Sequence, residues 1–180
     1  GKPVVLAGAG SKGIEISVSH DDELLLCVGG PGPQGCDVHP LQARSREDWI
    51  ALLSDARSSL LDDLVAGGDS LTVAGTRIWS AVEAVRKATG ARQIELSVDR
   101  RIDGGVLLQV RTAAGRGSVV TFPAKLTLGP EKMVAVVASD PTTAAVPQEA
   151  HPAPHPKQAG RATVAPPRWR RWMAAKAVTR

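Results

Sequence analysis

The chain has 180 residues, of which 43% are hydrophobic and only 3% aromatic, with a formal net charge of +4. This length accommodates one ordinary domain with an appendage, and the apolar content is sufficient for a core. The longest apolar runs, such as Leu24–Val28 and Met133–Ala138, are far too short to span a membrane, and no charged-then-apolar leader begins the sequence. We therefore predict a soluble, cytoplasmic protein.

The excess of positive charge lies near the C-terminus. The whole chain contains 22 Lys or Arg and 18 Asp or Glu; from Ser139 onward there are seven basic and two acidic residues, which leaves 15 basic and 16 acidic residues before it. The body of the protein is thus close to neutral. The basic balance therefore gives no indication of a nucleic-acid partner for the folded part.

The first forty residues have the pattern of short strands separated by glycine turns. Ile14–Ser19 alternates apolar and polar residues, as a half-buried strand does, and Leu24–Val28 is a continuous apolar run. Two prolines and four glycines in Gly29–Gly35 predict a turn, which leads into a short strand at Gly35–Val38.

Helical periodicity begins at about Arg46. A first helix is predicted from there to Gly67–Gly68, and a second from about Leu71 to Thr89, with Gly90 just past its end. The apolar face of the first consists of Trp49, Leu52, Leu53, Ala56, Leu60 and Leu64. The apolar stripe of the second consists of Ile78, Val82, Val85 and Thr89.

Strands return after the second helix. The predicted strands are Gln93–Val98, Val106–Arg111, Ser118–Leu126 and Met133–Ala138. Because glycine-containing turns separate them, we expect the last three to form an antiparallel meander. Strands, two helices and strands again predict an α+β domain over residues 1–138. Residues 139–180 are rich in Pro and Ala without periodicity, so we expect a disordered tail with a basic end that contains tryptophan.

Two tempting motifs lack the context that their chemistry needs. Gly8–Gly13 fits the dinucleotide-binding glycine pattern, but a strand-like segment follows where a helix would have to begin. Ser19–Asp22 holds the residue types of a hydrolase triad, yet neighbouring residues of a strand point to opposite faces. Cys27 and Cys36 lack metal-site spacing, and we expect both to be buried free thiols.

A third constellation is more informative. Asp37 ends a short strand after a glycine turn, and Trp79, Glu83 and Lys87 share one face of the second helix. Two carboxylates from different elements with a lysine one turn further suit Mg²⁺ and a phosphate, because Mg²⁺ takes few carboxylates together with water and phosphate oxygens. Alternatively, Asp37 only shapes a turn, and Glu83 and Lys87 are a solvated pair on the helix.

Together, the motifs resemble the 4′-phosphopantetheinyl transferase family in its longer, surfactin-synthetase-type form. The matching segments, in the family's order over residues 1–138, are Gly1-Lys2-Pro3, Ser19-His20, Gly35-Cys36-Asp37-Val38 and Trp79…Glu83-Ala84…Lys87. The helix pattern Trp-x-Ala-x-Glu-x-x-Arg-Lys is similar to transferase domains at the C-termini of enediyne-type iterative polyketide synthases. Coenzyme A lies between two α+β halves in this family, which implies that most of the first half precedes this chain.

The resemblance implies a transfer of the phosphopantetheine arm of coenzyme A to a serine of an acyl carrier protein, with Mg²⁺ as cofactor. It assigns the metal to Asp37 and Glu83. His39, which stands where the longer forms usually have a second acid, is a weak third ligand. Glu83 would also accept the serine proton, and Lys87 would steady the diphosphate.

The resemblance also implies how coenzyme A is held. Lys2 and Pro3 would line the adenine end, and Ser19 with His20 would contact the 3′-phosphate. Val82 stands where the family usually has lysine.

Together with His39, Val82 leaves a second possibility open, a non-catalytic transferase-like module that docks carriers within a synthase. Two tryptophans among the cations of Arg168–Arg180 raise a third, binding to nucleic acid or a membrane, against a simple solvated terminus. We predict neither nucleic acid nor membrane as a partner.

Overall fold

The computed structural model describes residues 13–21, 24–125 and 129–138. The predicted coenzyme A contacts Lys2 and Pro3, most of the Gly8–Gly13 loop and the predicted tail 139–180 lie outside these residues. The described part is α+β, as the sequence indicated, with antiparallel sheets; it has three α-helices where two were predicted. No helix within it has both the length and the apolar composition needed to cross a membrane.

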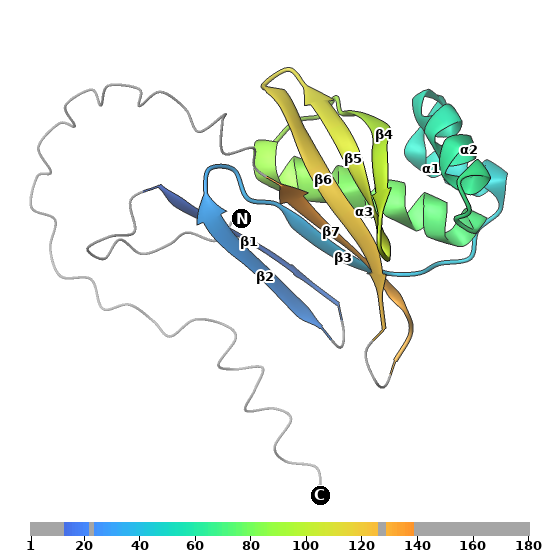
Figure 1. Ribbon diagram of the computed structural model, residues 1–180, viewed down its shortest axis with the longest axis horizontal. Helices are drawn as coiled ribbons and strands as arrows, with labels where there is room; N and C mark the ends of the chain where they lie inside the picture. The colour runs from blue at the N-terminus through green and yellow to red at the C-terminus, as the bar shows by residue number, and fades with distance from the viewer. Residues whose placement is uncertain (1–12, 22–23, 126–128, 139–180) are drawn as a thin grey trace, which may run out of the picture. The chain divides into compact units, whose positions relative to one another are not determined.

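A five-stranded antiparallel sheet forms the centre of the fold, with strand order β3-β7-β6-β5-β4 (Figure 1). Its strands are β3 (Cys36–Pro40), β4 (Glu95–Ile102), β5 (Gly105–Thr112), β6 (Gly115–Ala124) and β7 (Lys132–Ala138). The predicted meander of the last three strands is confirmed, and β4 extends it by one strand. The early strand β3 joins the sheet at its far edge, beside β7, with Asp37 opposite Ala135.

A separate two-stranded sheet lies beside this edge. It is a hairpin of β1 (Ile14–His20) and β2 (Leu25–Pro31), in which Ser17 pairs with Val28. The predicted strand and its alternating burial are confirmed, but the buried face is not the apolar one expected of a half-buried strand: Ser17 and Ser19 are buried, and Ile14 is exposed. The polar residues of this strand are thus the ones that face inward.

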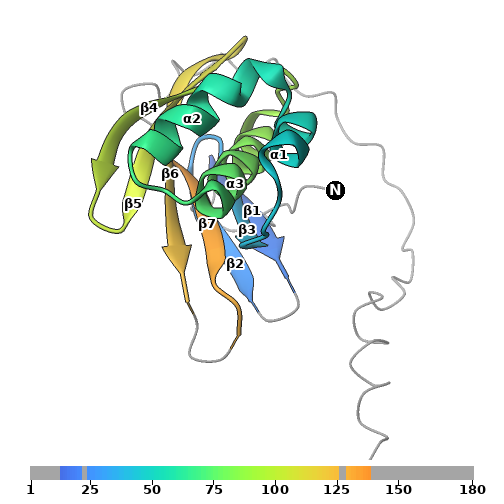
Figure 2. The ribbon, with the colours of Figure 1, turned by 90° about the vertical axis from the view of Figure 1, so that its right-hand side faces the viewer.

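The long helix α3 (Leu71–Thr89) packs against the sheet, and α1 and α2 cover the same face (Figures 1 and 2). The Ser70 hydroxyl accepts the backbone N–H of Val73 at 3.2 Å at the start of α3. Gly90 ends the helix in the left-handed conformation, at a φ of 70°. The predicted bounds are confirmed, but Thr89 of the predicted apolar stripe is exposed.

The first helix is not continuous, so its prediction as one element was wrong. The structure divides it into α1 (Arg46–Leu53), a 3₁₀ turn (Asp55–Arg57) and α2 (Ser58–Ala66). At Ser54 the backbone has φ 71° and ψ 154°, which no helix adopts. The Arg57 guanidinium, which donates to the carbonyl oxygens of Leu53 (2.6 Å) and Ile94 (3.0 Å), stabilises the break.

The break redirects the apolar side chains that a straight helix would have aligned. Leu52 and Ala56 are exposed, although the helical pattern placed them on the apolar face. The buried residues of the two short helices are Trp49, Leu53, Leu60, Leu61 and Leu64. These side chains join the core between the helices and the sheet.

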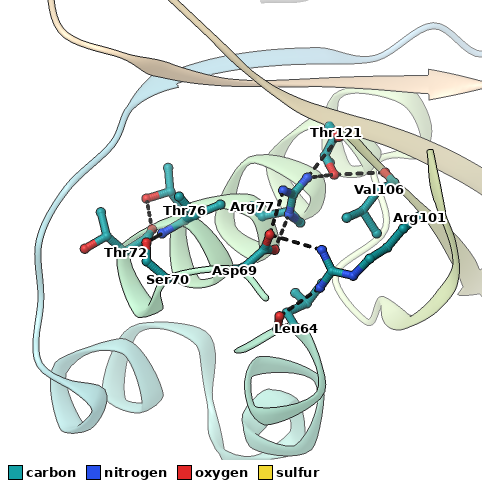
Figure 3. Close-up of polar contacts among 10 residues, drawn as sticks. Leu64, Asp69, Ser70, Thr72, Thr76, Arg77, Arg101, Val106 and Thr121 are labelled. Atoms are coloured by element: carbon teal, nitrogen blue, oxygen red, sulfur yellow. Dashed lines mark hydrogen bonds and ion pairs between the residues drawn. The ribbon is translucent and has the colours of Figure 1, made fainter. Parts of the chain in front are cut away.

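A buried ionic network fastens α3 to the sheet (Figure 3). The Arg77 side chain is 3% exposed; its Nε donates to Asp69 Oδ2 at 2.8 Å, and its Nη1 donates to the Thr121 carbonyl at 2.9 Å. Arg101 of β4 donates to Asp69 Oδ1 at 3.2 Å and to the Leu64 carbonyl at 2.8 Å. Asp69 thus connects the start of α3 with α2 and two strands.

Candidate functional site

Three residues predicted to act together meet where β1, β3 and α3 converge. The Lys87 ammonium in the last turn of α3 lies 2.8 Å from Asp37 Oδ1 on β3. Ser19, near the end of β1, donates its hydroxyl to the same carboxylate oxygen at 3.0 Å. Residues from three distant segments of the chain therefore form one cluster.

The Lys87 ammonium is fully satisfied in this cluster. Besides Asp37 Oδ1 it donates to Ser19 Oγ and to the Cys36 carbonyl oxygen, both at 3.0 Å. An ammonium has three N–H donors, so all of them are in use. The side chain nevertheless retains 34% of its exposure, which leaves it next to solvent.

The Ser19 hydroxyl is also saturated, which argues against a Ser–Lys nucleophilic pair. It donates to Asp37 and accepts both the Lys87 ammonium and, at 3.1 Å, the backbone N–H of Val38. Ser17 accepts the N–H of Cys36 in the same way at 3.1 Å. The two hydroxyls of β1 thus satisfy donors along the free edge of β3, a role that motif spacing did not predict.

Asp37 is buried, yet only one of its oxygens is paired. The residue is 7% exposed, and Oδ1 accepts both Ser19 and Lys87. Oδ2 is buried and has no hydrogen-bond partner. A buried acceptor left without a partner costs about 1–3 kcal/mol, and more for a charged group. An oxygen kept in this state is suited to a cation.

The neighbouring residues of β3 and α3 extend the cluster into a seam. His39, two residues beyond Asp37 on the same face of β3, meets the Trp79 ring edge-to-face at 6.5 Å, and its Nδ1 lies 2.9 Å from the Pro40 carbonyl. Trp79, Glu83 and Lys87 follow one another at helical spacing. Glu83 therefore lies along α3 between the two points at which the helix contacts β3.

Glu83 is the more accessible of the two predicted carboxylate ligands. Its side chain is 28% exposed, and its Oε1 pairs with Arg86 at 2.7 Å on the helix surface. Within the described ranges, no group of three or more His, Cys, Asp or Glu is arranged to hold a metal. Mg²⁺ requires fewer protein ligands, because water and phosphate oxygens complete its octahedron. The unpaired Asp37 Oδ2 fits such a site, and the bond of His39 Nδ1 to the Pro40 carbonyl leaves only Nε2 of that ring as a ligand atom.

The remaining predicted site residues lie apart from the cluster. His20 is exposed on the side of β1 opposite Ser19, so these two neighbours do not face the same space. Val82 is 4% exposed in the hydrophobic core, which accounts for an apolar residue at this position.

A further buried ion pair was not predicted. Lys132 Nζ of β7 lies 2.5 Å from Asp21 Oδ2, and its side chain is only 3% exposed. It attaches the end of β1 to the sheet, as Lys87 does from the helix.

The two cysteines differ in environment, which corrects the expectation that both are buried. Cys27 is exposed and Cys36 is buried, and both are free thiols. Burial raises the pKa of the Cys36 thiol, while the hydrogen bond with Ser17 and the charge of Lys87 act in the opposite direction. Cys36 is therefore held as a neutral thiol beneath the cluster.

Comparison of the sequence with models of known protein families finds no match, and comparison with curated proteins finds none either.

Proposed function

We propose that this chain is the catalytic half of a Mg²⁺-dependent 4′-phosphopantetheinyl transferase. It would transfer the phosphopantetheine arm of coenzyme A to a serine of an acyl carrier protein and release 3′,5′-ADP, within polyketide biosynthesis. The observation that carries this proposal is the buried, unpaired Oδ2 of Asp37 beside the ammonium of Lys87. A carboxylate oriented in this way suits a divalent cation that also binds a diphosphate.

Support comes from the order of the motifs together with their convergence. Ser19, Asp37 and Lys87 were selected from separate motifs, and their side chains lie within hydrogen-bond distance of one another. Glu83 follows on the same helix face, one turn before Lys87. For the proposed reaction, Asp37 would serve as a metal ligand, Glu83 as a base and Lys87 as a cation.

The chemistry requires charge neutralisation and a proton acceptor. When bound at Asp37 and Glu83, Mg²⁺ would offset the charge that develops on the diphosphate oxygens. Glu83, whose side chain reaches solvent, would accept the proton of the carrier serine directly or through one water. The serine oxygen then bonds to the phosphorus that bears pantetheine, and the bond from that phosphorus to 3′,5′-ADP breaks. As a metal ligand, Asp37 would position the diphosphate relative to the carrier serine.

A second candidate is a non-catalytic transferase-like module that docks carriers within a synthase. Where the family usually has lysine, this chain has Val82, which is buried in the core and offers no cation to a substrate. The His39 ring bonds the Pro40 carbonyl through Nδ1 and contacts the Trp79 ring. Coenzyme A binding separates the two proposals, because a docking module has no need of it. Calorimetric titration with coenzyme A, with and without Mg²⁺, of the chain extended upstream by the other half measures this directly.

The decisive experiment is the intact mass of an apo acyl carrier protein after incubation with coenzyme A, Mg²⁺ and the chain extended upstream by the other half that the resemblance implies. A transferase adds one phosphopantetheine arm, and EDTA abolishes the gain. Asp37→Asn should reduce the rate by at least about 100-fold, because the metal loses its charged ligand. Asp62→Asn is the matched control, since Asp62 forms an exposed pair with Arg46. Unchanged transfer by a folded Asp37→Asn variant would remove Asp37 from the metal site.

A further inference from the structure

The saturation of Lys87 raises a difficulty for its predicted role as a diphosphate ligand. Its three donors are occupied by Asp37 Oδ1, Ser19 Oγ and the Cys36 carbonyl oxygen. A phosphate oxygen gains no strong hydrogen bond from Lys87 until one of these is broken. Some event must therefore release the ammonium before it contacts a diphosphate.

We propose that Lys87 is the resident counter-ion of Asp37, and that a divalent cation bound at Asp37 Oδ2 displaces it. Cation binding and the Lys87–Asp37 ion pair then oppose each other, so the metal both occupies the site and frees the lysine. This inference takes the divalent cation from the proposed function; the exchange itself is argued from the geometry of Lys87 and Asp37.

The two cations compete for a single negative charge. Asp37 carries one charge, and its Oδ1 lies at ion-pair distance from Lys87, 2.8 Å away. A divalent cation at Oδ2 of the same carboxylate would stand within a few ångströms of the ammonium. Like charges at that separation repel strongly even where solvent partly screens them. Because the metal carries twice the charge of the ammonium and the Lys87 side chain is partly exposed, the lysine is the group that moves.

The position of Lys87 permits such a movement. It lies in the last turn of α3, and its side chain is 34% exposed, so the released ammonium has solvent beside it. Its flexible four-carbon stem allows the ammonium to turn toward solvent without any shift of the helix. Glu83, the other predicted metal ligand, lies one turn earlier on the same face. The freed ammonium would therefore lie next to a diphosphate held by the metal.

The exchange predicts an order of binding. Without a divalent cation Lys87 is occupied, so the chain binds a diphosphate weakly. With the cation present, the same lysine becomes an additional ligand. Linkage requires the reverse effect as well: whatever removes the Lys87 charge must strengthen cation binding at Asp37 by the same coupling free energy.

The first test is a Mn²⁺ titration followed by electron paramagnetic resonance, with no coenzyme A present. Lys87→Met keeps most of the stem and removes the charge, and it should bind Mn²⁺ at least about tenfold more tightly than the unaltered chain. Arg100→Met is the charge-matched control. Arg100 is exposed on β4 at the opposite edge of the sheet, so its loss should change the Mn²⁺ affinity less than about twofold. Asp37→Asn should lose the site.

Three outcomes of this titration overturn the proposal. Weaker binding by folded Lys87→Met would show that Lys87 orients Asp37 for the metal instead of competing with it. Unchanged binding would show that the two are independent. No Mn²⁺ binding by either chain would mean that Asp37 Oδ2 is not a cation site.

A second measurement uses the unaltered chain, so it does not depend on the folding of a variant. Reductive methylation with isotope-labelled formaldehyde, read by peptide mass spectrometry, reports how accessible each lysine amine is. Lys87 should react slowly without metal and several-fold faster at saturating Mg²⁺, whereas exposed Lys125 should be unaffected. Equal reactivity of Lys87 with and without Mg²⁺ would contradict the exchange.

The carrier-protein mass assay distinguishes the failure of this inference from the failure of the proposed function. If Lys87 is displaced by the cation but no phosphopantetheine is transferred, the exchange stands and the transferase proposal fails. If phosphopantetheine is transferred without any exchange at Lys87, the transferase proposal stands and the exchange fails.

Discussion

Gly35 lies so close to Ala84 that no side chain fits between the two residues. A Cβ at Gly35 would overlap the carbonyl oxygen of Ala84 and approach the Ala88 Cβ to 2.9 Å. Gly35 immediately precedes β3, and Ala84 lies in α3 beside Glu83. The glycine of the Gly-Cys-Asp-Val motif thus brings strand and helix together at the cluster.

We therefore expect Gly35→Ala to destabilise the protein by about 3 kcal/mol, because a helix backbone gives way less easily than a side chain. Urea denaturation followed by circular dichroism measures the effect. Gly117→Ala is the control, because a Cβ at Gly117 meets nothing within 4 Å, and it should change the free energy of unfolding by less than about 0.5 kcal/mol. Equal effects of the two substitutions would show that the close approach is not required.

Ser54 offers the opposite case, in which glycine should stabilise. Its φ of 71° and ψ of 154° fall in a region that residues with a Cβ rarely occupy, at a cost of about 1–3 kcal/mol. Ser54→Gly should raise the free energy of unfolding by about 1 kcal/mol. Ser59→Gly, the same substitution within α2, should lower it by about 0.5 kcal/mol. Thermal denaturation of both variants tests the difference in sign.

The cysteines should respond differently to pH and to alkylation. Burial raises the pKa of Cys36, so the folded state holds this proton to a higher pH than the unfolded chain. The free energy of unfolding should therefore fall as the pH rises above the ordinary thiol range, and Cys36→Ala should show a smaller fall. Iodoacetamide should modify exposed Cys27 in the folded protein and spare Cys36. Rapid alkylation of Cys36 at pH 8 would contradict this.

Two aspartates test how burial affects an ion pair. Asp69→Asn leaves the buried guanidinium of Arg77 without its counter-ion, and we expect a loss of about 3–5 kcal/mol. Asp62→Asn removes an exposed partner of Arg46 and should cost less than about 1 kcal/mol. Chemical denaturation of both variants gives the comparison. Similar losses would mean that the network of Figure 3 does not contribute to the attachment of α3.

Local signals in the sequence were sufficient for part of the fold. Ser70 and Gly90 mark the two ends of α3, because a hydroxyl cap and a left-handed glycine act on neighbouring backbone groups. The break at Ser54 has no such signal. It depends on contacts that Arg57 makes with Ile94, 37 residues away in the chain. Pairing of β3 with β7 likewise joins distant segments, which periodicity does not encode.

The candidate site shows the same division. Helical spacing predicted correctly that Glu83 and Lys87 share a face of α3, since that depends on local geometry alone. One of the three acceptors of Lys87 is the backbone carbonyl oxygen of Cys36. Every residue carries such a carbonyl, so the amino acid at position 36 gives no indication that Lys87 would bond there. Ser17 was missed because it caps an edge N–H that only the folded sheet defines.

The attachment of the β1–β2 hairpin has a consequence for how this domain changes over evolution. Hydrogen bonds and ion pairs that involve side chains join β1 and the residue after it to β3, β7 and α3. The side chains are those of Ser17, Ser19, Cys36, Asp37, Lys87, Asp21 and Lys132. A backbone ladder is insensitive to the identity of its residues, whereas each of these links is removed by one codon change. Selection can thus loosen or tighten the hairpin in small steps without altering either sheet.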